Sequence, residues 1–520
     1  MSETAIRSDR PPAADAAPPG WEPQQVAALA VIAICGILVA LTQTLLVPVL
    51  GQIQGDLGST TSDTQWLLTS TLLSAAVAVP VFGRLGDLYG KRLMLLVSTG
   101  ALLLGSLICA LTSDLAVMIA GRAITGISSA AIPLGVSLIG TVLPRERVGA
   151  GIALVSATLG IGGALGLPLS ALVAEQADYH ALFWICVGGA AIAFAGISTQ
   201  VAEPPRTGRG RLDLAGTALL SATLICLLLP LAQANTWGWG DGRTLGLLAA
   251  SVAGIVLFVA VERRVASPLV DVVANARPAL LLTNVASLAV GFALFASLIG
   301  TAAYVQAPAA TGYGFGSSVL AGGLAMLPSG VAMLLLSPVS AKLTVRFGPK
   351  VTLALGAAIV ALGFLFRIVF VDAYWQVVVG TTIAGAGTGI AYAAMPSLIL
   401  LGARRSQLAA ANGLNTLFRS AGSSLASAIG GTLLASMTVS LAGHELPSLG
   451  AYRTLFAICA GAALIGALIA LVIPRDDPDA EQGDEHDEAE QQRSGAGVAG
   501  RQRVGEDDDR ERAGQQPDAR

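Results

Sequence analysis

The stretch GRLGDLYGKR, at residues 83–92, concentrates charge and glycine between two long apolar runs. Its carboxylate could cap the N-terminus of a helix or pair with a cation across an interface. Its glycines allow a sharp turn and a close approach of neighbouring helices, and its cations favour the aqueous side of a membrane. The residues with these properties are Gly83, Asp87, Gly90, Lys91 and Arg92.

A second set of polar residues lies inside the apolar runs. Arg122 is about two turns into one run, where burial of a cation costs roughly 2.5–3.5 kcal/mol on insertion scales, so we expect it to face a polar cavity. It could contact a substrate or a proton-linked partner, or it could brace helices. Arg367 lies nearer a run's end and could snorkel to the interface. The candidates for substrate contact or proton coupling are Arg122, Gln43, Arg419 and Asn415.

The motifs of several other chemistries are missing from the sequence. It contains no Gly-x4-Gly-Lys-[Ser/Thr] phosphate loop, which argues against ATP-driven transport by this chain alone. The histidines and cysteines have no metal-ligand spacing, and we find no nucleophile–base set and no basic groove with aromatic residues. We therefore expect no enzyme activity, no metal, no cofactor and no nucleic-acid partner.

The elements that must position the polar residues are predicted to be membrane-spanning helices. The 520 residues are 54% hydrophobic and 12% charged, about half the charged fraction of a typical soluble domain. Apolar runs long enough to cross a hydrocarbon core of ~30 Å recur along the chain. The fourteen predicted spans lie near residues 25–50, 64–83, 93–112, 115–142, 150–174, 180–201, 213–233, 243–262, 279–306, 317–340, 351–371, 374–401, 408–437 and 451–473.

Lys and Arg alternate between the loops. Loops after even-numbered spans hold sixteen of them, and loops after odd-numbered spans hold two, Arg243 and Arg453. Short loops rich in Lys and Arg stay in the cytoplasm, so the pattern predicts a multi-pass protein of the cell membrane with both termini cytoplasmic. Residues 1–24 are predicted to be a cytoplasmic tail, and residues 474–520 an acidic, disordered cytoplasmic tail.

The chain also resembles itself. The segment 83–92 follows the second span, and AKLTVRFGPK, at 341–350, follows the tenth at an offset of 258 residues, so that Gly90 aligns with Gly348. Matching spans are eight apart, which predicts two six-helix halves with two helices inserted between them. Repeated halves around a midplane substrate site are typical of secondary transporters. The predicted parts are an N-terminal bundle at 25–205, two inserted helices and flanking loops at 206–278, and a C-terminal bundle at 279–473.

Residues 83–92 resemble the loop signature of the major facilitator superfamily, Gly-x-Leu-x-Asp-x-x-Gly-[Arg/Lys]-[Arg/Lys]. Arg122 and Gly126 resemble the family's Arg-x-x-x-Gly pattern, and LDLAG (212–216) with ERRVASPLVD (262–271) resembles its fourteen-helix drug:proton antiporter branch. The resemblance implies an all-α polytopic membrane protein with the major facilitator fold, made of two six-helix repeats plus two inserted central helices. It also implies that the segment 83–92 is a latch for the outward-facing state; the alternative is a loop that only fixes topology.

Two departures from that branch bear on mechanism. The first span reads LTQT at 41–44, with Thr42 where the branch places an acid, and no other acid lies deep in a span. Proton coupling would then fall to Asp87 or to competition at Arg122, and neutral or anionic substrates are favoured over dications. The fifth span lacks the family's Gly-Pro pair, although its small residues permit close packing and a bend. The residues assigned to helix packing are Gly126, Gly162, Gly166 and Pro168.

The resemblance implies a secondary active transporter in the lipid bilayer. It would export small organic compounds, such as drugs, antibiotics or secondary metabolites, by proton antiport with alternating access, acting as a monomer. Its partners would be a small-molecule substrate and protons. Two alternatives stay open: a proton-coupled uptake carrier or uniporter, which the missing acid in the first span favours, and a non-transporting membrane receptor or scaffold.

Overall fold

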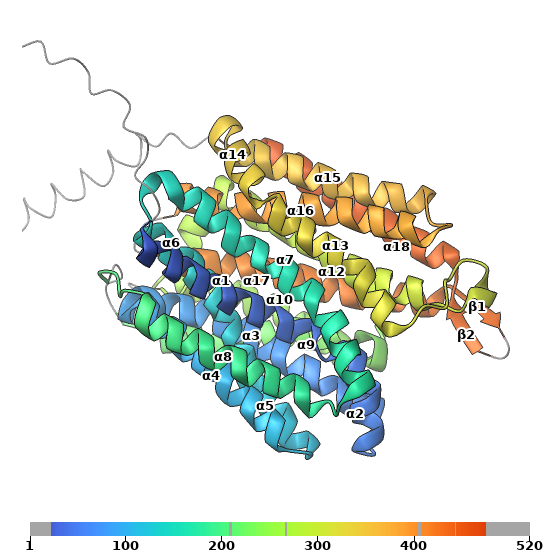
Figure 1. Ribbon diagram of the computed structural model, residues 1–520. Helices are drawn as coiled ribbons and strands as arrows, with labels where there is room; N and C mark the ends of the chain where they lie inside the picture. The colour runs from blue at the N-terminus through green and yellow to red at the C-terminus, as the bar shows by residue number, and fades with distance from the viewer. Residues whose placement is uncertain (1–21, 207–210, 266–267, 404–406, 442–443, 475–520) are drawn as a thin grey trace, which may run out of the picture. The chain divides into compact units, whose positions relative to one another are not determined.

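The computed structural model describes residues 22–206, 211–265, 268–403, 407–441 and 444–474. Within these ranges the chain forms long helices that pack side by side, with one short pair of strands (Figure 1). Apart from residues 22–24 and 474, the two predicted tails lie outside the described residues.

Six predicted spans make up the first half, and side-chain caps fix where several of its helices begin. The Thr60 hydroxyl accepts a hydrogen bond from the Asp63 amide at 3.1 Å, and Asp114 accepts one from the Val117 amide at 3.0 Å. These caps satisfy N–H groups that have no partner within the helix. The elements are α1 (Pro23–Thr44), η1 (Val47–Val49), α2 (Leu50–Asp56), α3 (Thr61–Tyr89), α4 (Lys91–Leu111), α5 (Leu115–Gly126), η2 (Ile127–Ala130), α6 (Ala131–Val142), α7 (Arg145–Gln176) and α8 (His180–Gln200).

The inserted helices and the second half follow in the predicted order. A short antiparallel pair of strands, which the sequence did not predict, joins the last two long helices, with Thr438 opposite Pro447. The inserted elements are α9 (Leu214–Trp237), α10 (Gly242–Glu262) and α11 (Val272–Asn275). The second half contains α12 (Pro278–Gln306), η3 (Ala309–Thr311), α13 (Val319–Leu335), α14 (Ser337–Phe347), α15 (Pro349–Val369), α16 (Tyr374–Gly402), α17 (Leu408–Ser436), β1 (Thr438–Leu441), β2 (His444–Pro447) and α18 (Leu449–Val472).

Each of the fourteen predicted spans overlaps one helix or one group of consecutive helices. Among the described residues, twelve helical segments are long and apolar enough to cross a membrane, and α13 with α14, bent by 42°, makes a thirteenth. The fourteenth, α17, has 29 residues, and polar side chains such as Asn415 and Arg419 lower its hydropathy. The described chain therefore has the all-α, polytopic architecture that the sequence predicts.

The stretch at 83–92 is mostly helix, whereas the sequence predicted a loop. α3 continues through Tyr89, and only Gly90 separates it from α4, with a φ of +124° that residues with side chains rarely adopt. The repeated stretch does the same, because α14 ends at Phe347 and Gly348 has a φ of +85°. The predicted span stopped too early because charged residues continue the helix beyond the apolar run.

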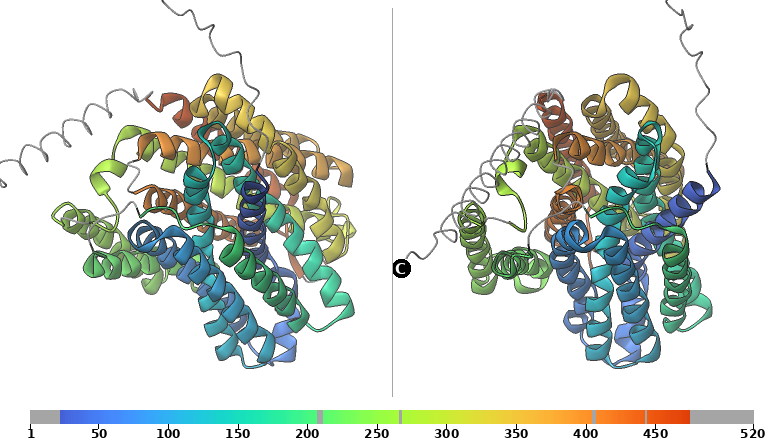
Figure 2. Two further views of the ribbon diagram at one scale, coloured as in Figure 1. Left: turned by 60° about the vertical axis from the view of Figure 1, so that its left-hand side comes forward. Right: turned by 90° about the vertical axis from the view of Figure 1, so that its left-hand side faces the viewer.

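The two main interfaces between the halves are related by the internal repeat. α7 packs against α13, and α3 packs against α17, so that the second and fifth spans of each half meet the fifth and second spans of the other. The inserted helices α9 and α10, coloured green, lie together beside the bundle in both views of Figure 2. α9 packs against both α3 and α17. The insertion therefore covers the α3–α17 interface between the halves, which is called the seam below.

The two described ends of the helical bundle belong to different buried clusters. Ala28, near the start of α1, is in the same cluster as Ala409 in the first turn of α17. Ile473, after α18, is in a cluster with Leu353 near the start of α15.

Candidate functional site

Asp87 joins the two halves of the molecule. It lies in the last turn of α3 and is 0% exposed. Its carboxylate oxygens accept hydrogen bonds from the backbone N–H groups of Ala409 at 3.4 Å and Ala410 at 3.2 Å, in the first turn of α17. Helix N-termini present unpaired amides and partial positive charge. The Asp87 carboxylate thus caps a helix of the opposite half, one of the two interactions left open by the sequence.

The seam is close enough for this cap because Gly83 has no side chain. A Cβ at this position would lie 2.9 Å from the Ala409 carbonyl oxygen and 3.1 Å from the Ala410 Cα. Both are backbone atoms of α17, which a side-chain rotation cannot move away. A larger residue at position 83 would therefore push α3 and α17 apart.

The other alternative, a cation across the interface, is not seen among the described residues, because the cations that act on Asp87 belong to its own half. Lys91 is 3% exposed, and its Nζ lies 3.7 Å from Asp87 Oδ1. Arg84, one turn before Asp87, is 5% exposed, and its charge also acts on the Asp87 carboxyl. Asp87 therefore has two sets of partners: cations of its own half and amides of the opposite half.

A second carboxylate, Glu203, holds the turn that follows Asp87. It accepts hydrogen bonds from the amides of Arg92 at 3.3 Å and Leu93 at 3.1 Å, and thereby caps α4. A Cβ on Gly90 would lie within 3.0 Å of this carboxylate, so the position needs glycine for space as well as for its backbone angle. Arg92 donates to the Ser198 carbonyl at 2.5 Å. The sequence analysis did not single out Glu203, although it is an acid two residues after the predicted sixth span and just before the arginines of the following loop.

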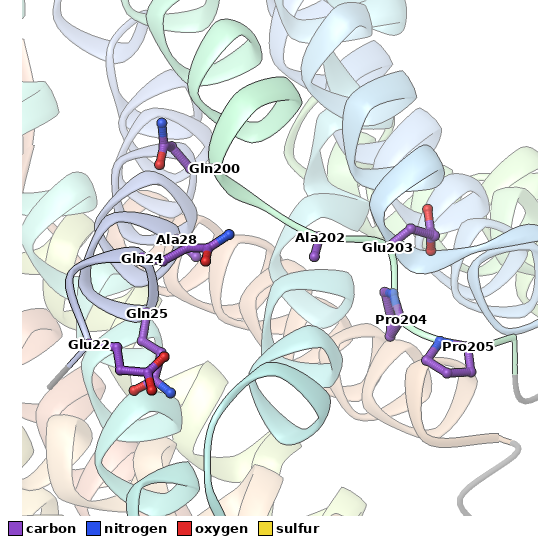
Figure 3. Close-up of a pocket in the computed structure, with 9 residues that line it drawn as sticks. All are labelled: Glu22, Gln24, Gln25, Ala28, Gln200, Ala202, Glu203, Pro204 and Pro205. Carbon is purple, nitrogen blue, oxygen red and sulfur yellow. The ribbon is translucent and has the colours of Figure 1, made fainter. Parts of the chain in front are cut away.

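Glu203 also lines a cavity of about 280 Å³ between the start of α1 and the segment after α8 (Figure 3). Figure 3 shows Glu22, Gln24 and Gln25 on one side of this cavity and the extended chain from Ala202 to Pro205 on the other. None of the predicted substrate-contact residues, Gln43, Arg122, Asn415 and Arg419, lines it. It is therefore not the predicted midplane substrate pocket, which stays a prediction.

Arg122 is 2% exposed and binds backbone carbonyl groups. Its Nε donates to Leu67 O of α3 at 3.3 Å, and its side chain donates to Thr42 O of α1 at 3.0 Å. The guanidinium therefore ties three helices of the first half together, as the bracing alternative requires. Gln43, one residue from the Thr42 carbonyl, has an exposed side chain in the last turn of α1.

Arg367 does not snorkel. It is 0% exposed and donates to Ser297 Oγ at 3.1 Å and to Thr301 Oγ1 at 2.8 Å, both on α12. Its guanidinium lies over the Phe456 ring, 3.8 Å from the centroid. The surrounding helices supply hydroxyl groups and an aromatic face at this depth, so the side chain has no need to reach the interface.

The two buried arginines occupy related places in the two halves. At the repeat offset of 258, Arg122 corresponds to Gly380 and Arg367 to Cys109. A Cβ on Gly380 would lie 2.3 Å from Arg367 Cγ, so the arginine of α15 fills the space at the α16 position that matches Arg122. Each half thus buries one guanidinium between its third and fourth spans and bonds it to its own first span.

Arg419 and Asn415 lie on α17, in different surroundings. Arg419 is half-buried, and its guanidinium lies 4.8 Å from the Tyr392 ring centroid. Asn415 is buried and donates to Asn284 Oδ1 at 3.0 Å and Ser287 Oγ at 2.5 Å, both on α12. Asn415 therefore makes a helix–helix contact in this state, whereas Arg419 keeps an accessible surface.

The glycines and the proline of α7 contact two different helices. A Cβ on Gly162 would lie 2.5 Å from the Ile37 carbonyl oxygen, and one on Gly166 would lie 2.0 Å from Thr44 Oγ1, so both face α1. Pro168 instead faces Gly323 of α13, in the opposite half. Gly126 approaches the Thr71 carbonyl of α3. The four predicted packing residues all lie at close helix–helix contacts.

The charged groups within the helices are mostly cations. The groups that act on Arg122, Arg367 and Arg419 include no carboxylate among the described residues. The described residues also contain no group of three or more His, Cys, Asp or Glu placed to hold a metal ion. The arrangement can hold two halves in one conformation and present a cation within a helical bundle.

Comparisons with known proteins agree with this architecture. The family model described as Major Facilitator Superfamily matches residues 32–329 and 294–504. The Tetracenomycin C resistance and export protein of Streptomyces glaucescens is 28% identical over 78% of this chain and 76% of its own length. The Multidrug resistance protein Stp of Mycobacterium tuberculosis is 26% identical over 71% of this chain and 68% of its own. The crystal structure of the human organic anion transporter MFSD10 (TETRAN) has a TM-score of 0.61 and 15% identity, over 86% of this chain and 100% of that chain.

Proposed function

Because this chain belongs to the major facilitator superfamily, whose members are membrane transporters, we propose that it exports small organic compounds from the cell in exchange for protons. Two relatives, a tetracenomycin C resistance and export protein and a multidrug resistance protein, support export of drugs, antibiotics or secondary metabolites. Uptake of a metabolite is the competing direction.

The contact from Asp87 to Ala410 is the observation that carries the proposed mechanism. It lies on the seam between the halves, and it uses a charge–amide interaction that breaks when the helices separate. Alternating access requires such a seam to open on one side while the other closes. The Asp87 end is cytoplasmic in this proposal, following the Lys and Arg pattern, so the structure corresponds to a state closed toward the cytoplasm.

The substrate is a neutral or anionic organic compound in this proposal. Arg419 keeps an accessible surface, and no described carboxylate neutralises it. A buried cation without an acid partner repels a dication and attracts an anion. Tyr392, 3% exposed beneath the guanidinium, holds the Arg419 side chain in place by a cation–π contact that leaves its charge unneutralised.

Asp87 is also the proposed group for proton coupling. Arg122 already binds two carbonyl groups, which supports bracing over direct competition with protons. A proton on Asp87 would remove the charge that caps α17 and so release the seam. The energy comes from the membrane gradient, at about 2.3 kcal/mol per proton per 100 mV plus the pH term.

Membrane vesicles of defined orientation test direction and substrate charge together. We expect everted vesicles to accumulate an anionic dye when the membrane is energised, and right-side-out vesicles to exclude it. An otherwise similar dicationic dye should move at least tenfold more slowly. Accumulation only in right-side-out vesicles would support uptake, and strong transport of the dication would contradict the proposed substrate class.

A further inference from the structure

The inserted helix pair lies against the two helices that Asp87 joins. α9 packs on α3 and α17, whereas α10 packs mainly on α9 (Figure 2). Away from Asp87, the Thr236 hydroxyl donates to Gln65 Oε1 of α3 at 3.1 Å, and Trp239 Nε1 donates to Thr432 Oγ1 of α17 at 2.6 Å. The insertion is thus bonded to both sides of the seam.

Two carboxyl groups of the insertion meet at its other end. Asp213 caps α9, with Oδ1 accepting from the Gly216 amide at 2.9 Å. Glu262 is the last residue of α10 and is 3% exposed. A Cβ on Gly216 would lie 2.4 Å from Glu262 Oε1 and 2.5 Å from Asp213 Oδ2. The two oxygens therefore flank the space that a side chain at position 216 would fill.

These carboxylate oxygens are buried. Among the described residues, none donates a hydrogen bond to Asp213 Oδ2 or to either oxygen of Glu262. The amides of Leu269 and Val270 face the Glu262 carboxyl without reaching hydrogen-bond geometry. Two adjacent buried carboxylates repel each other, and such pairs hold one proton between them. A shared proton would supply the missing donor.

The charge of Arg84 acts both on this carboxyl pair and on Asp87. Among the described residues, the charged groups that act electrostatically on the Glu262 carboxyl are Asp213 and Arg84 of α3. The charge of Arg84 also acts on Asp87, one turn further along α3. Arg84 therefore lies under the influence of two acidic sites, one on the insertion and one on the seam.

We propose that Asp213 and Glu262 form a shared proton-binding site on the inserted helix pair, and that Arg84 transmits its protonation state to the Asp87 cap. When the pair loses its proton, its added negative charge draws Arg84 away from Asp87, which is left to cap α17. When the pair is protonated, Arg84 turns to Asp87 and competes with the α17 amides for that carboxylate. Acidification on this side therefore loosens the seam. This inference rests on the proposed gating function of Asp87.

Distance measurements between spin labels test the proposal on the full chain in lipid nanodiscs, without substrate. The labels replace Tyr89 and Phe347, which are exposed at 48% and 51% and end the two repeated helices α3 and α14, in a chain whose five native cysteines are replaced. We expect the longer-distance population to grow as the pH falls from about 8.5 to 5.5. E262Q should weaken this dependence and leave only the part that protonation of Asp87 itself contributes.

Two further variants make the result specific. D213N keeps the α9 cap but leaves Glu262 without its acidic neighbour, so the midpoint of the pH response should move to lower pH. D271N, which alters another helix-capping acid of the same insertion, should keep the parental pH response.

The possible outcomes distinguish the proposed proton site at Asp213 and Glu262 from the proposed gating function of Asp87. If E262Q keeps the parental pH response, or the parent shows none while D87N lengthens the distance, the proton site is refuted and the gate stands. If D87N leaves the distance unchanged, the gating function of Asp87 fails together with the inference built on it.

Discussion

The Asp87 carboxylate and the Ala410 amide are hydrogen-bonded at 3.2 Å across the boundary between the two halves of the molecule. The two residues are 323 positions apart in the chain, so the bond exists only when both halves are assembled in this conformation. Glu203 makes a similar cap on α4, but entirely within the first half. The Asp87 cap therefore holds the seam between the halves, and the Glu203 cap holds the turn beside it.

Removing the charge of Asp87 should open the seam. D87N keeps the size and one acceptor but loses a charge–helix interaction of about 0.3–2 kcal/mol, which lowers the ratio of closed to open molecules roughly two- to thirtyfold. The readout is the labelling rate of A410C, 7% exposed in this state, by a membrane-impermeant thiol reagent. E203Q is the matched control and should leave the rate unchanged. Equal labelling of D87N and its parent would count against the latch.

Neighbouring glycines of α7 should respond differently to the same substitution. A Cβ at position 162 would meet Ile37 O at 2.5 Å, whereas one at position 163 has nothing within 4 Å. We expect G162A to destabilise the protein by about 1–3 kcal/mol through overpacking. G163A should be neutral or gain up to ~1 kcal/mol of helix propensity. Thermal unfolding in detergent measures both, and equal melting temperatures would contradict the assigned packing face.

The guanidinium of Arg367 should contribute to stability through its geometry. R367K keeps the charge but cannot bond Ser297 and Thr301 together while lying flat on Phe456. We expect a loss of about 1–3 kcal/mol in the free energy of unfolding. R346K alters an exposed arginine and should change stability by less than ~0.5 kcal/mol. A wild-type melting temperature for R367K would mean that charge alone suffices at this site.

Arg419 should affect substrate choice more than folding. R419Q removes a half-buried cation over Tyr392, so transport of an anionic dye should fall at least ~10-fold, equivalent to about 1.4 kcal/mol, while a neutral dye changes less. R419K should retain part of the preference for the anion. R243Q, which removes an exposed arginine of the insertion, serves as the control. Equal losses for both dyes would point to a structural role instead.

The fold was largely predictable because membrane helices leave strong local signals. Apolar length, loop charge and the 258-residue repeat predict the order of the helices and the matching turns at Gly90 and Gly348. The ends of α3 and α14 were not predictable from hydropathy, because both helices continue into charged residues beyond the apolar run. The strand pair at 438–447 gives only a short signal and was missed.

The site was only partly predictable, because its contacts are made between distant segments. The spacing in residues 83–92 leaves Asp87 either a helix cap or an ion-pair partner and does not identify the helix it caps. Asp213 and Glu262 lie in the two stretches that bracket the insertion, but only the fold places their carboxyl groups on either side of Gly216. Glu203 is an acid after a span until the fold places it at the start of α4. Arg367 also looks peripheral in sequence, and only the packing of α12 and α18 around it reveals a buried position.

The measurement that bears most directly on transport by alternating access uses purified protein in liposomes with an imposed pH gradient and no nucleotide. An acidic lumen should drive accumulation of an anionic dye, a proton ionophore that collapses the gradient should abolish it, and D87N should lower its rate at least tenfold. Accumulation that survives collapse of the gradient, or that is unchanged in D87N, would contradict a proton-driven carrier latched at Asp87.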